Sequence, residues 1–260
     1  MTPRVELLKD LVADLRMAAS FVTILPVASS KPAGDGAIAR ATWALPVAGL
    51  LVGLAGALVY KIASRFGLTP NLAALLALAT TALITGALHE DGLADTADGL
   101  GGGRTRERKL EIMRDSRIGT YGASALILSF GLRWGALAAI ANPFAVMLAL
   151  CAAHTAARAG VPAFMSLVPP ARPDGLSAGA GSPPGRSVAI AFALGTFVLA
   201  LALGPGKALA ALILLTLAGL ILARLAVRQI GGQTGDILGA FEQTGEILIL
   251  LVAASFQMGR

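Results

Sequence analysis

The stretch LAALLALATTALITGALHEDGLADTADGL, residues 72–100, passes from an almost purely apolar run into four closely spaced acidic residues. The apolar part, residues 72–88, has the length and composition of a helix that crosses the hydrocarbon core of a bilayer, which takes about 17–25 residues. Carboxylates directly after such a run are energetically costly unless they are paired or bound to a cation. The stretch therefore predicts a membrane helix that ends in a functional site.

The composition of the whole chain supports a membrane protein. The 260 residues are 56% hydrophobic and only 14% charged, with a mean hydropathy of +0.76. A soluble domain has about 25% charged residues. The single cysteine, Cys151, excludes an internal disulfide framework, and we expect no cleaved signal peptide at the start. The net charge of +6 suits anionic lipids or an anionic substrate.

Seven apolar stretches approach the length of a membrane span. They cover residues 42–60, 72–90, 120–141, 144–165, 187–203, 207–223 and 236–256. Their high content of alanine, leucine and glycine suits closely packed transmembrane helices. We therefore expect an all-α, polytopic integral membrane protein with about seven transmembrane helices, forming one helical membrane domain over residues 1–260.

The N-terminal segment has a different pattern. Residues 5–16 alternate so that leucine and valine side chains share one helical face and charged side chains share the other. This pattern predicts an amphipathic helix at the membrane interface. The following apolar stretch, residues 17–28, is either outside the membrane or partly inserted.

Basic residues are distributed unevenly between the two sides of the membrane. If the seven spans alternate in direction, one side receives the N-terminal segment and the connections 99–118, 167–186 and 224–235. These four segments hold fifteen of the 21 lysine and arginine residues. The positive-inside rule then places this side, with all the polar motifs described below, in the cytoplasm.

The aspartates after the first stretch form the strongest candidate site. At 100° per residue, Asp91, Asp95 and Asp98 fall on one face of a helix. Carboxylate oxygens are the ligands that Mg²⁺ and Mn²⁺ prefer, and the negative end of a helix that stops at Gly99 would favour a cation further. His89 is expected either to orient a ligand carboxylate or to bond the helix end. The alternative is a solvated helix end without metal.

A basic segment follows the aspartates. In RTRERKLEIMRDSRIGTYG, residues 104–122, the motif around Arg114, Asp115 and Arg117 interleaves both charges where the next span begins. Arginine forks bind phosphate oxygens in bidentate fashion, and a metal beside arginine is typical of phosphoryl transfer. The alternative is that these arginines only fix the topology or contact anionic lipid.

A glycine-rich segment, GGQTGDILGAFEQTGE, residues 231–246, precedes the last span. Thr234 or Asp236 is suited to cap the helix, and a helix start behind glycines such as Gly232 offers N–H groups to phosphate. Asp236 is alternatively a further metal ligand. The alternative for the segment is a capped helix with polar packing contacts.

Among the charged residues inside predicted spans, Glu246 and Arg158 are candidate substrate contacts. Glu246 is a functional candidate because a carboxylate is costly in the membrane interior. Arg158 is costly for the same reason unless it is paired or reaches a polar cavity, where it would contact substrate. His154, in the same span as Arg158, is expected to be packed rather than catalytic.

These segments resemble the cobalamin synthase family, the adenosylcobinamide-GDP ribazoletransferases. The resemblance rests on HEDGLADTADGL (residues 89–100), KLEIMRDSRIGTYG (109–122) and the glycine-rich segment, and FVTILPV (21–27) and GLLVGLAGALV (49–59) extend it. The chain departs from the family at Ile24, where many members carry arginine. The resemblance thus covers much of the chain.

The resemblance implies a reaction. Adenosylcobinamide-GDP and α-ribazole, or its 5′-phosphate, would give adenosylcobalamin, or its 5′-phosphate, and GMP. Mg²⁺, with Mn²⁺ as a second candidate, would lie on Asp91, Asp95 and Asp98, while Arg114 and Arg117 would hold phosphate oxygens. Asp95 or Asp98 would accept the proton of the attacking ribose hydroxyl.

The same resemblance implies where the protein works and with what. We expect a multi-pass protein of the bacterial cytoplasmic (inner) membrane. Its expected partners are the two substrates and the lipid bilayer, with a second copy of the chain (a homo-oligomer) as a further candidate, but no nucleic acid. The active site would face the cytoplasm, where a nucleotide substrate is found.

Two other functions fit parts of the pattern. Enzymes that transfer a phosphoalcohol from a CDP-alcohol carry D-G-x2-A-R followed by G-x3-D-x3-D, but here Asp95 stands in the place of the arginine and the second half is missing. A cation transporter would line its pathway with helical acids, but more naturally at the middle of the membrane, and it would not need the neighbouring arginines.

Overall fold

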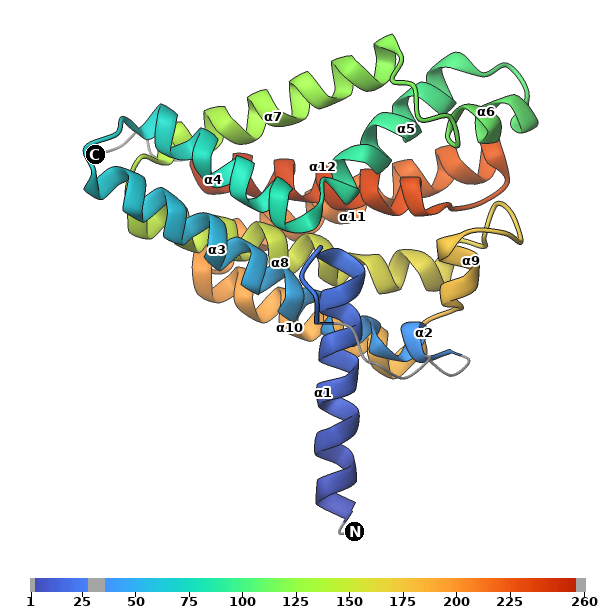
Figure 1. The fold of residues 1–260 in the computed structure, drawn as a ribbon, viewed down its shortest axis with the longest axis horizontal. Helices are drawn as coiled ribbons and strands as arrows, with labels where there is room; N and C mark the ends of the chain where they lie inside the picture. The colour runs from blue at the N-terminus through green and yellow to red at the C-terminus, as the bar shows by residue number, and fades with distance from the viewer. Residues whose placement is uncertain (1–2, 28–35, 256–260) are drawn as a thin grey trace.

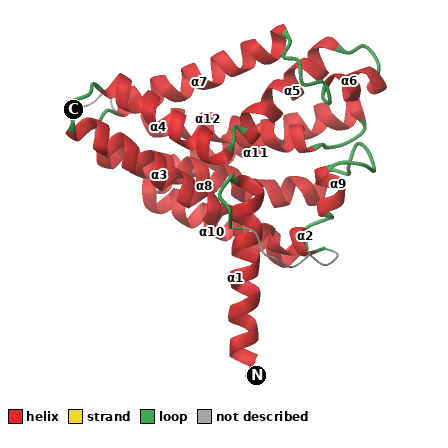
Figure 2. Ribbon diagram, viewed as in Figure 1, coloured by secondary structure: helices red, strands yellow, loops and turns green. Residues whose placement is uncertain are grey.

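The computed structural model describes residues 3–27 and 36–255, and their regular structure is entirely helical (Figure 2). Six helical segments are long and apolar enough to cross a membrane. They are Ala37–Arg65, which comprises the short α2 (Ala37–Ala41), a 3-10 turn and α3 (Leu45–Arg65), then α7 (Thr120–Ile140), α8 (Pro143–Leu167), α10 (Gly185–Leu203), α11 (Pro205–Ile230) and α12 (Gly235–Ala254). The predicted all-α polytopic membrane fold is confirmed.

The predicted span over residues 72–90 is not one continuous helix. Residues 72–90 are divided between α4 (Pro70–Thr85) and α5 (Leu88–Gly102), which meet at an angle of 88°. The break lies at Gly86 and Ala87, whose φ angles of 61° and 55° are left-handed. A helix cannot continue through that conformation, and it is uncommon for alanine.

This break corrects the predicted setting of the acidic residues. Glu90 and Asp91 lie in the first turn of the separate helix α5, where the helix dipole is positive. Only Asp98 lies near the C-terminal end of that helix. The prediction that the negative end of a membrane helix attracts the cation is therefore wrong for Asp91.

The long helices run along a common direction (Figure 1). Helices α8 and α12 are the most enclosed, with 67% and 72% of their apolar windows buried, against 22% and 17% for α10 and α11. The latter two therefore form the periphery that faces lipid. Glycines bring α3 against α8, because a Cβ atom at Gly49 would lie 2.1 Å from the carbonyl oxygen of His154. Such small residues permit close helix contact in membranes.

The N-terminal helix α1 (Pro3–Val22) projects from the side of the bundle, across the direction of the long helices (Figure 1). The structure corrects the predicted boundary between residues 5–16 and 17–28, because a single helix reaches Val22. Residues 28–35 lie outside the described part of the chain. Asp14, buried on α1, accepts hydrogen bonds from Trp43 Nε1 (3.0 Å) and Arg40 Nε (3.3 Å). Helix α1 is thereby tied to α2 and to the 3-10 turn that precede α3.

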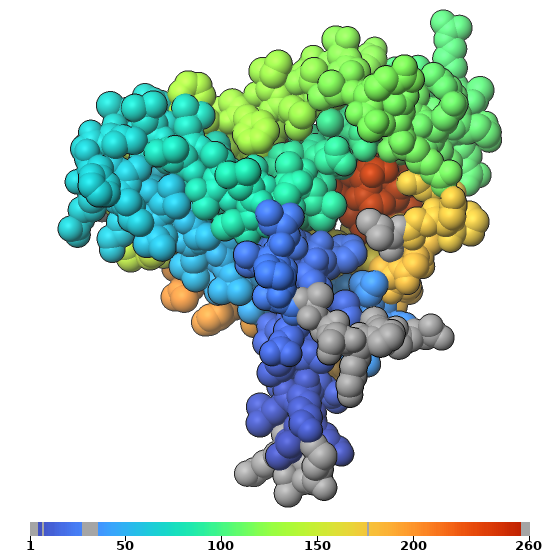
Figure 3. Space-filling view, in the orientation of Figure 1, coloured from blue at the N-terminus to red at the C-terminus, as the bar shows by residue number. Residues whose placement is uncertain are grey.

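The remaining short helices gather at one end of the bundle. Helices α5, α6 (Arg106–Ile112) and α9 (Leu176–Ala180) lie at the opposite end from the α3–α4 connection and the end of α12 (Figure 1). The beginning of α12 reaches the surface between the segments around α6 and α9 (Figure 3). The acidic, basic and glycine-rich segments that the sequence singles out therefore meet at this end.

Candidate active site

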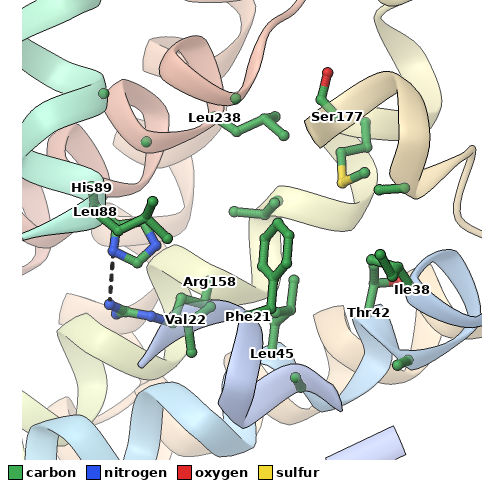
Figure 4. Close-up of a pocket in the computed structure, with 18 of the residues that line it drawn as sticks. Phe21, Val22, Ile38, Thr42, Leu45, Leu88, His89, Arg158, Ser177 and Leu238 are labelled. Carbon is green, nitrogen blue, oxygen red and sulfur yellow. Dashed lines mark hydrogen bonds between the residues drawn. The ribbon is translucent and has the colours of Figure 1, made fainter. Parts of the chain in front are cut away.

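A cavity of about 410 Å³ lies where α1, α5, α8, α9 and α12 meet. Most of its wall is apolar, and Phe21 from α1 and Leu45 from α3 point into it (Figure 4). His89 and Arg158 lie together on one side (Figure 4). The carboxylate-bearing residues Asp91 and Asp236 also line it. The cavity therefore joins an apolar chamber to charged groups from three helices.

The three predicted aspartates have different surroundings. Asp91 is exposed, Asp95 is half-buried and Asp98 is buried. Both carboxylate oxygens of Asp98 accept backbone hydrogen bonds from the start of α7, at 2.7 Å from Gly119 N and 2.9 Å from Gly122 N. A Cβ atom at either glycine would lie within 2.5 Å of an oxygen of Asp98. Asp98 thus fastens α5 to α7 and keeps only its remaining lone pairs for a cation.

Asp236 at the start of α12 joins this acidic group. Helices α5 and α12 pack so closely that a Cβ atom at Gly92 would lie 2.9 Å from the carbonyl oxygen of Asp236. Burial raises the pKa of Asp95 to about 7, and the carboxylates of Asp91, Asp236 and Asp98 add to that rise. The group therefore concentrates negative charge that a divalent cation would relieve.

Arg172, which sequence reasoning missed, lies beside the same acidic group. Its Nη2 atom is 3.9 Å from Asp236 Oδ2, and its Nη1 atom is buried without a hydrogen-bond partner among the described residues. It comes from the connection between α8 and α9, far from Asp236 in the sequence. Only the folded chain brings the two together.

The donors at the aspartates suit Mg²⁺ by their chemistry. They are carboxylates from two helices, and Mg²⁺ commonly uses one or two carboxylates with water and substrate phosphates rather than a complete protein cage. Among the described residues, three ligand atoms come within 4.8 Å of one another only at His154, Glu242 and Glu246. There Arg158 Nη1 lies 2.5 Å from Glu242 and 2.9 Å from Glu246, so arginine already supplies the positive charge.

That second cluster belongs to a network of charged side chains inside the bundle. Its members are at most 8% exposed and come from four helices: His89 and Glu90 (α5), Arg133 (α7), His154 and Arg158 (α8), and Glu242 and Glu246 (α12). Arg133 Nη1 contacts Glu90 Oε1 at 3.2 Å and Glu246 Oε2 at 3.1 Å. The network joins α5, α8 and α12, which line the cavity, to α7, which does not.

The network revises several predicted roles. Arg158 is both paired and at the cavity wall, so the two situations that the sequence offered as alternatives occur together. Glu246 is held by Arg133, Arg158 and His154, and it does not line the cavity. His89 Nδ1 lies 3.4 Å from Arg158 Nη2 and faces the network instead of orienting an aspartate. His154 is packed but also ion-paired.

Sequence reasoning gave no role to Glu90 and Arg133 and little weight to Glu242. The sequence contained one indication that these charged residues pair with one another. Glu242–Glu246 and His154–Arg158 are both spaced i, i+4 on predicted spans, which places each pair on one helix face. Opposite charges on two spans favour a mutual partner inside the membrane.

The predicted phosphate-binding arginines lie on the surface at this end of the bundle. Arg117 makes a bidentate ion pair with Asp115, with Nη2–Oδ2 at 2.6 Å, and this holds the pKa of Asp115 at about 2. Arg114 Nη2 lies 2.5 Å from Asp174 Oδ2. Asp115, predicted to bind substrate, thus orients an arginine here. In the described part of the chain, neither arginine is paired with Asp91, Asp95 or Asp98, so phosphate would have to replace their present partners Asp174 and Asp115.

The loop of the glycine-rich segment differs from the phosphate-binding role predicted for Gly232. The N–H groups of Gly231, Gly232 and Gln233 donate to the carbonyl oxygens of Val227, Ala226 and Pro169, so they are not open to phosphate. Gly232 instead permits close contact, because a Cβ atom there would lie 2.1 Å from the carbonyl oxygen of Pro169.

The predicted helix cap at the start of α12 is confirmed. Thr234 Oγ1 accepts a hydrogen bond from Ile237 N (3.3 Å) and donates one to Asp236 Oδ2 (3.0 Å). Thr234 therefore orients the carboxylate of Asp236 instead of offering its hydroxyl proton to substrate.

An all-helical membrane protein with clustered carboxylates and nearby arginines beside a cavity has the equipment of a membrane-bound phosphoryl-transfer enzyme. Comparison with known proteins narrows this class. The family model described as cobalamin-5-phosphate synthase matches residues 14–254, and the chain belongs to that family. The resemblance drawn from the sequence is confirmed.

The curated relatives agree with one another in their names. The chain is 87% identical, over the full length of both proteins, to the adenosylcobinamide-GDP ribazoletransferase of Bradyrhizobium diazoefficiens. It is 52% identical to that of Mesorhizobium japonicum, over 95% of this chain and 94% of the relative. It is 45% identical to that of Azorhizobium caulinodans, over 93% and 95%. No solved structure matches.

Proposed function

We propose that this chain is a membrane-bound adenosylcobinamide-GDP ribazoletransferase. It joins adenosylcobinamide-GDP to α-ribazole, or to α-ribazole 5′-phosphate, and forms adenosylcobalamin, or its 5′-phosphate, with release of GMP. The observation that carries the proposal is the 87% identity, over its whole length, to a relative of that name. The family match favours this reaction over CDP-alcohol phosphotransfer and cation transport.

The reaction exchanges one phosphorus–oxygen bond for another. The ribose hydroxyl of α-ribazole attacks the phosphorus nearer cobinamide, the bond from that phosphorus to the bridging oxygen breaks, and GMP leaves with that oxygen. A carboxylate accepts the hydroxyl proton. Asp95 suits this role better than Asp98, because both oxygens of Asp98 are held by the start of α7.

We also propose that the reaction depends on Mg²⁺, with Mn²⁺ as a substitute. Asp91, Asp95 and Asp236 would hold the ion, and the remaining lone pairs of Asp98 could contribute. A divalent cation there would neutralise charge on the diphosphate and on the leaving GMP. Asp98 and Thr234 position the acidic helices, and Arg172 adds positive charge beside Asp236.

The direct test supplies both substrates to the purified protein. Adenosylcobinamide-GDP, α-ribazole 5′-phosphate and Mg²⁺ are incubated with protein in liposomes, and we expect GMP and a new corrinoid in equal amounts. Omission of α-ribazole 5′-phosphate controls for simple hydrolysis. Absence of the new corrinoid with either acceptor would overturn the proposed function.

The orientation in the membrane can be tested by thiol labelling. We propose that the active-site end faces the cytoplasm from a bacterial inner membrane, because the basic residues are concentrated at that end of the bundle. In a Cys151→Ser background, an impermeant thiol reagent added to intact spheroplasts should leave Ser116→Cys unlabelled and label Arg65→Cys. Both positions are exposed, at opposite ends of the bundle. The reverse pattern would overturn the orientation.

A further prediction concerns the surface arginines. If Arg114 and Arg117 bind phosphate during the reaction, their planar forks matter more than their charge. Arg114→Lys and Arg117→Lys should then lower turnover by about 10- to 1000-fold, by analogy with the loss of one transition-state donor. Arg104→Lys, also exposed, is the matched control and should have little effect. Turnover is measured at equal amounts of folded membrane protein.

Substitution of Asp174 distinguishes phosphate binding by Arg114 from a purely structural role of that arginine. If Arg114 serves only to pair with Asp174, then Asp174→Asn should lower turnover as much as Arg114→Lys does. If Arg114 binds phosphate, Asp174→Asn leaves turnover high because it frees the arginine. Full activity in both lysine variants would exclude the phosphate role.

A further inference from the structure

The cavity has a wall that restricts what it can bind. Its lining is formed largely by apolar side chains, including Phe21, Leu45, Val161, Met165 and Leu238. Its volume of about 410 Å³ is at the small end of ordinary ligand pockets, which range over roughly 300–1,000 Å³. Such a wall favours a flat, apolar group over a polar one.

Different parts of the two substrates differ in how well they suit an apolar cavity of this size. A corrin macrocycle is far larger than a bicyclic base, and its amide side chains need hydrogen-bond partners when they are buried. Guanine presents donors and acceptors along its edges, which an apolar wall leaves unpaired. The base of α-ribazole is a benzimidazole with two methyl groups, and once it is joined to ribose it keeps a single ring nitrogen as acceptor. Its chemistry matches the wall.

The charged side of the cavity fixes an orientation. Arg158 is at the wall, but Glu242 and Glu246 hold its guanidinium, so its charge is compensated and attracts no phosphate into the chamber. Its Nε atom is buried without a hydrogen-bond partner among the described residues. Asp91 and Asp236 line the same cavity and mark where it meets the acidic group.

We infer that this cavity is the binding site for the dimethylbenzimidazole end of α-ribazole, with the base among the apolar side chains and the ribose directed toward Asp91 and Asp236. The inference rests on the proposed function. It assigns the acceptor to the cavity, and it leaves the larger corrin outside, along the surface at this end of the bundle.

Filling the cavity tests the assignment. Val161→Phe and Leu238→Phe each place a ring inside the chamber, and Val227→Phe places one on the exposed face of α11 as a matched control. We expect the two cavity variants to raise KM for α-ribazole by about 10- to 100-fold. KM for adenosylcobinamide-GDP should change less than threefold, and the control should change neither.

A change of ligand tests the same point without a mutation. The riboside of unmethylated benzimidazole lacks two buried methyl groups and should bind the wild-type protein roughly tenfold more weakly than α-ribazole. Phe21→Ala removes part of the wall instead of filling it, so it should also weaken α-ribazole binding. Phe21→Ala therefore still tests the inference if Val161→Phe or Leu238→Phe fails to fold.

Thermal unfolding separates binding from turnover. In detergent, α-ribazole alone should raise Tm of the wild type and of Val227→Phe, but not of Val161→Phe. A rise in KM for adenosylcobinamide-GDP, with KM for α-ribazole unchanged, would assign the cavity to the other substrate and overturn the inference. Unchanged values for both would also overturn it. A Tm shift by α-ribazole in a protein that releases no GMP would refute the proposed function but support the cavity assignment.

Discussion

Asp95→Asn is expected to lower turnover by about 100- to 1000-fold while the protein remains folded in the membrane. Asparagine keeps the size of the side chain but removes the negative charge and the capacity to accept a proton. Asp95 is half-buried, so the substitution leaves no buried charge unpaired. Burial, and after it the neighbouring carboxylates, raise the pKa of Asp95 to about 7, so loss of the charge relieves both effects and Tm should not fall. GMP release and Tm are measured on the same preparation.

Comparison with the other aspartates makes this result specific. Asp91→Asn should lower turnover to a similar extent without loss of Tm, because Asp91 is exposed at the cavity. Asp98→Asn should lower both, since an amide cannot accept the N–H groups of Gly119 and Gly122 with both of its terminal atoms. Asp10→Asn, an exposed aspartate on α1, is the control and should change neither.

Removal of metal completes the test. EDTA should abolish wild-type turnover, and added Mg²⁺ should restore it. Full turnover in EDTA would exclude a dissociable metal, whatever the aspartate variants do. Near-normal turnover of Asp95→Asn would instead remove Asp95 from the chemistry and leave the metal question to Asp91 and Asp236.

Much of the fold could be predicted from composition and apolar runs. In lipid, each span must form its backbone hydrogen bonds within its own helix, so a span can be recognised from its own stretch of sequence. The break between α4 and α5 could not be predicted. Gly86 sits in an apolar run, and Ala87 adopts a left-handed conformation that its own chemistry does not favour. The surrounding structure holds Ala87 there, and a local pattern contains no sign of it.

The site was predictable to the extent that its residues are neighbours in the chain. Asp91 and Asp95 share a helix, so spacing alone places them together. Arg133 is paired with Glu90 and Glu246, which are 43 and 113 positions away from it in the sequence. Gly232 was assigned to phosphate because its loop resembles an anion site, but its N–H group is taken by the end of α11. Long-range partners of this kind follow only from the packed helices.

Arg133→Met is expected to destabilise the protein by about 3–5 kcal/mol, because it leaves buried acidic groups without their cation. Glu90 is 5% exposed, and the guanidinium of Arg133 is its ion-pair partner in the described structure. Glu246 keeps Arg158 and His154, so Glu90 carries most of the loss. Tm and the yield of folded protein in detergent measure the effect. Arg108→Met, which breaks an exposed pair with Glu111, should change stability by no more than about 1 kcal/mol.

The double variant Glu90→Gln/Arg133→Met decides whether charge is the cause. Removal of both partners of a buried pair is often nearly neutral, because the desolvation penalty disappears with the attraction. We therefore expect the double variant to recover most of the Tm lost in Arg133→Met, and to recover turnover with it, since Glu90 adjoins Asp91 on α5. If Arg133→Met is as stable as the wild type, Glu90 is not held as a carboxylate by this arginine. If the double variant is no more stable than Arg133→Met, the loss comes from packing around Arg133, including its contact with the ring of Phe130, and not from the unpaired charge.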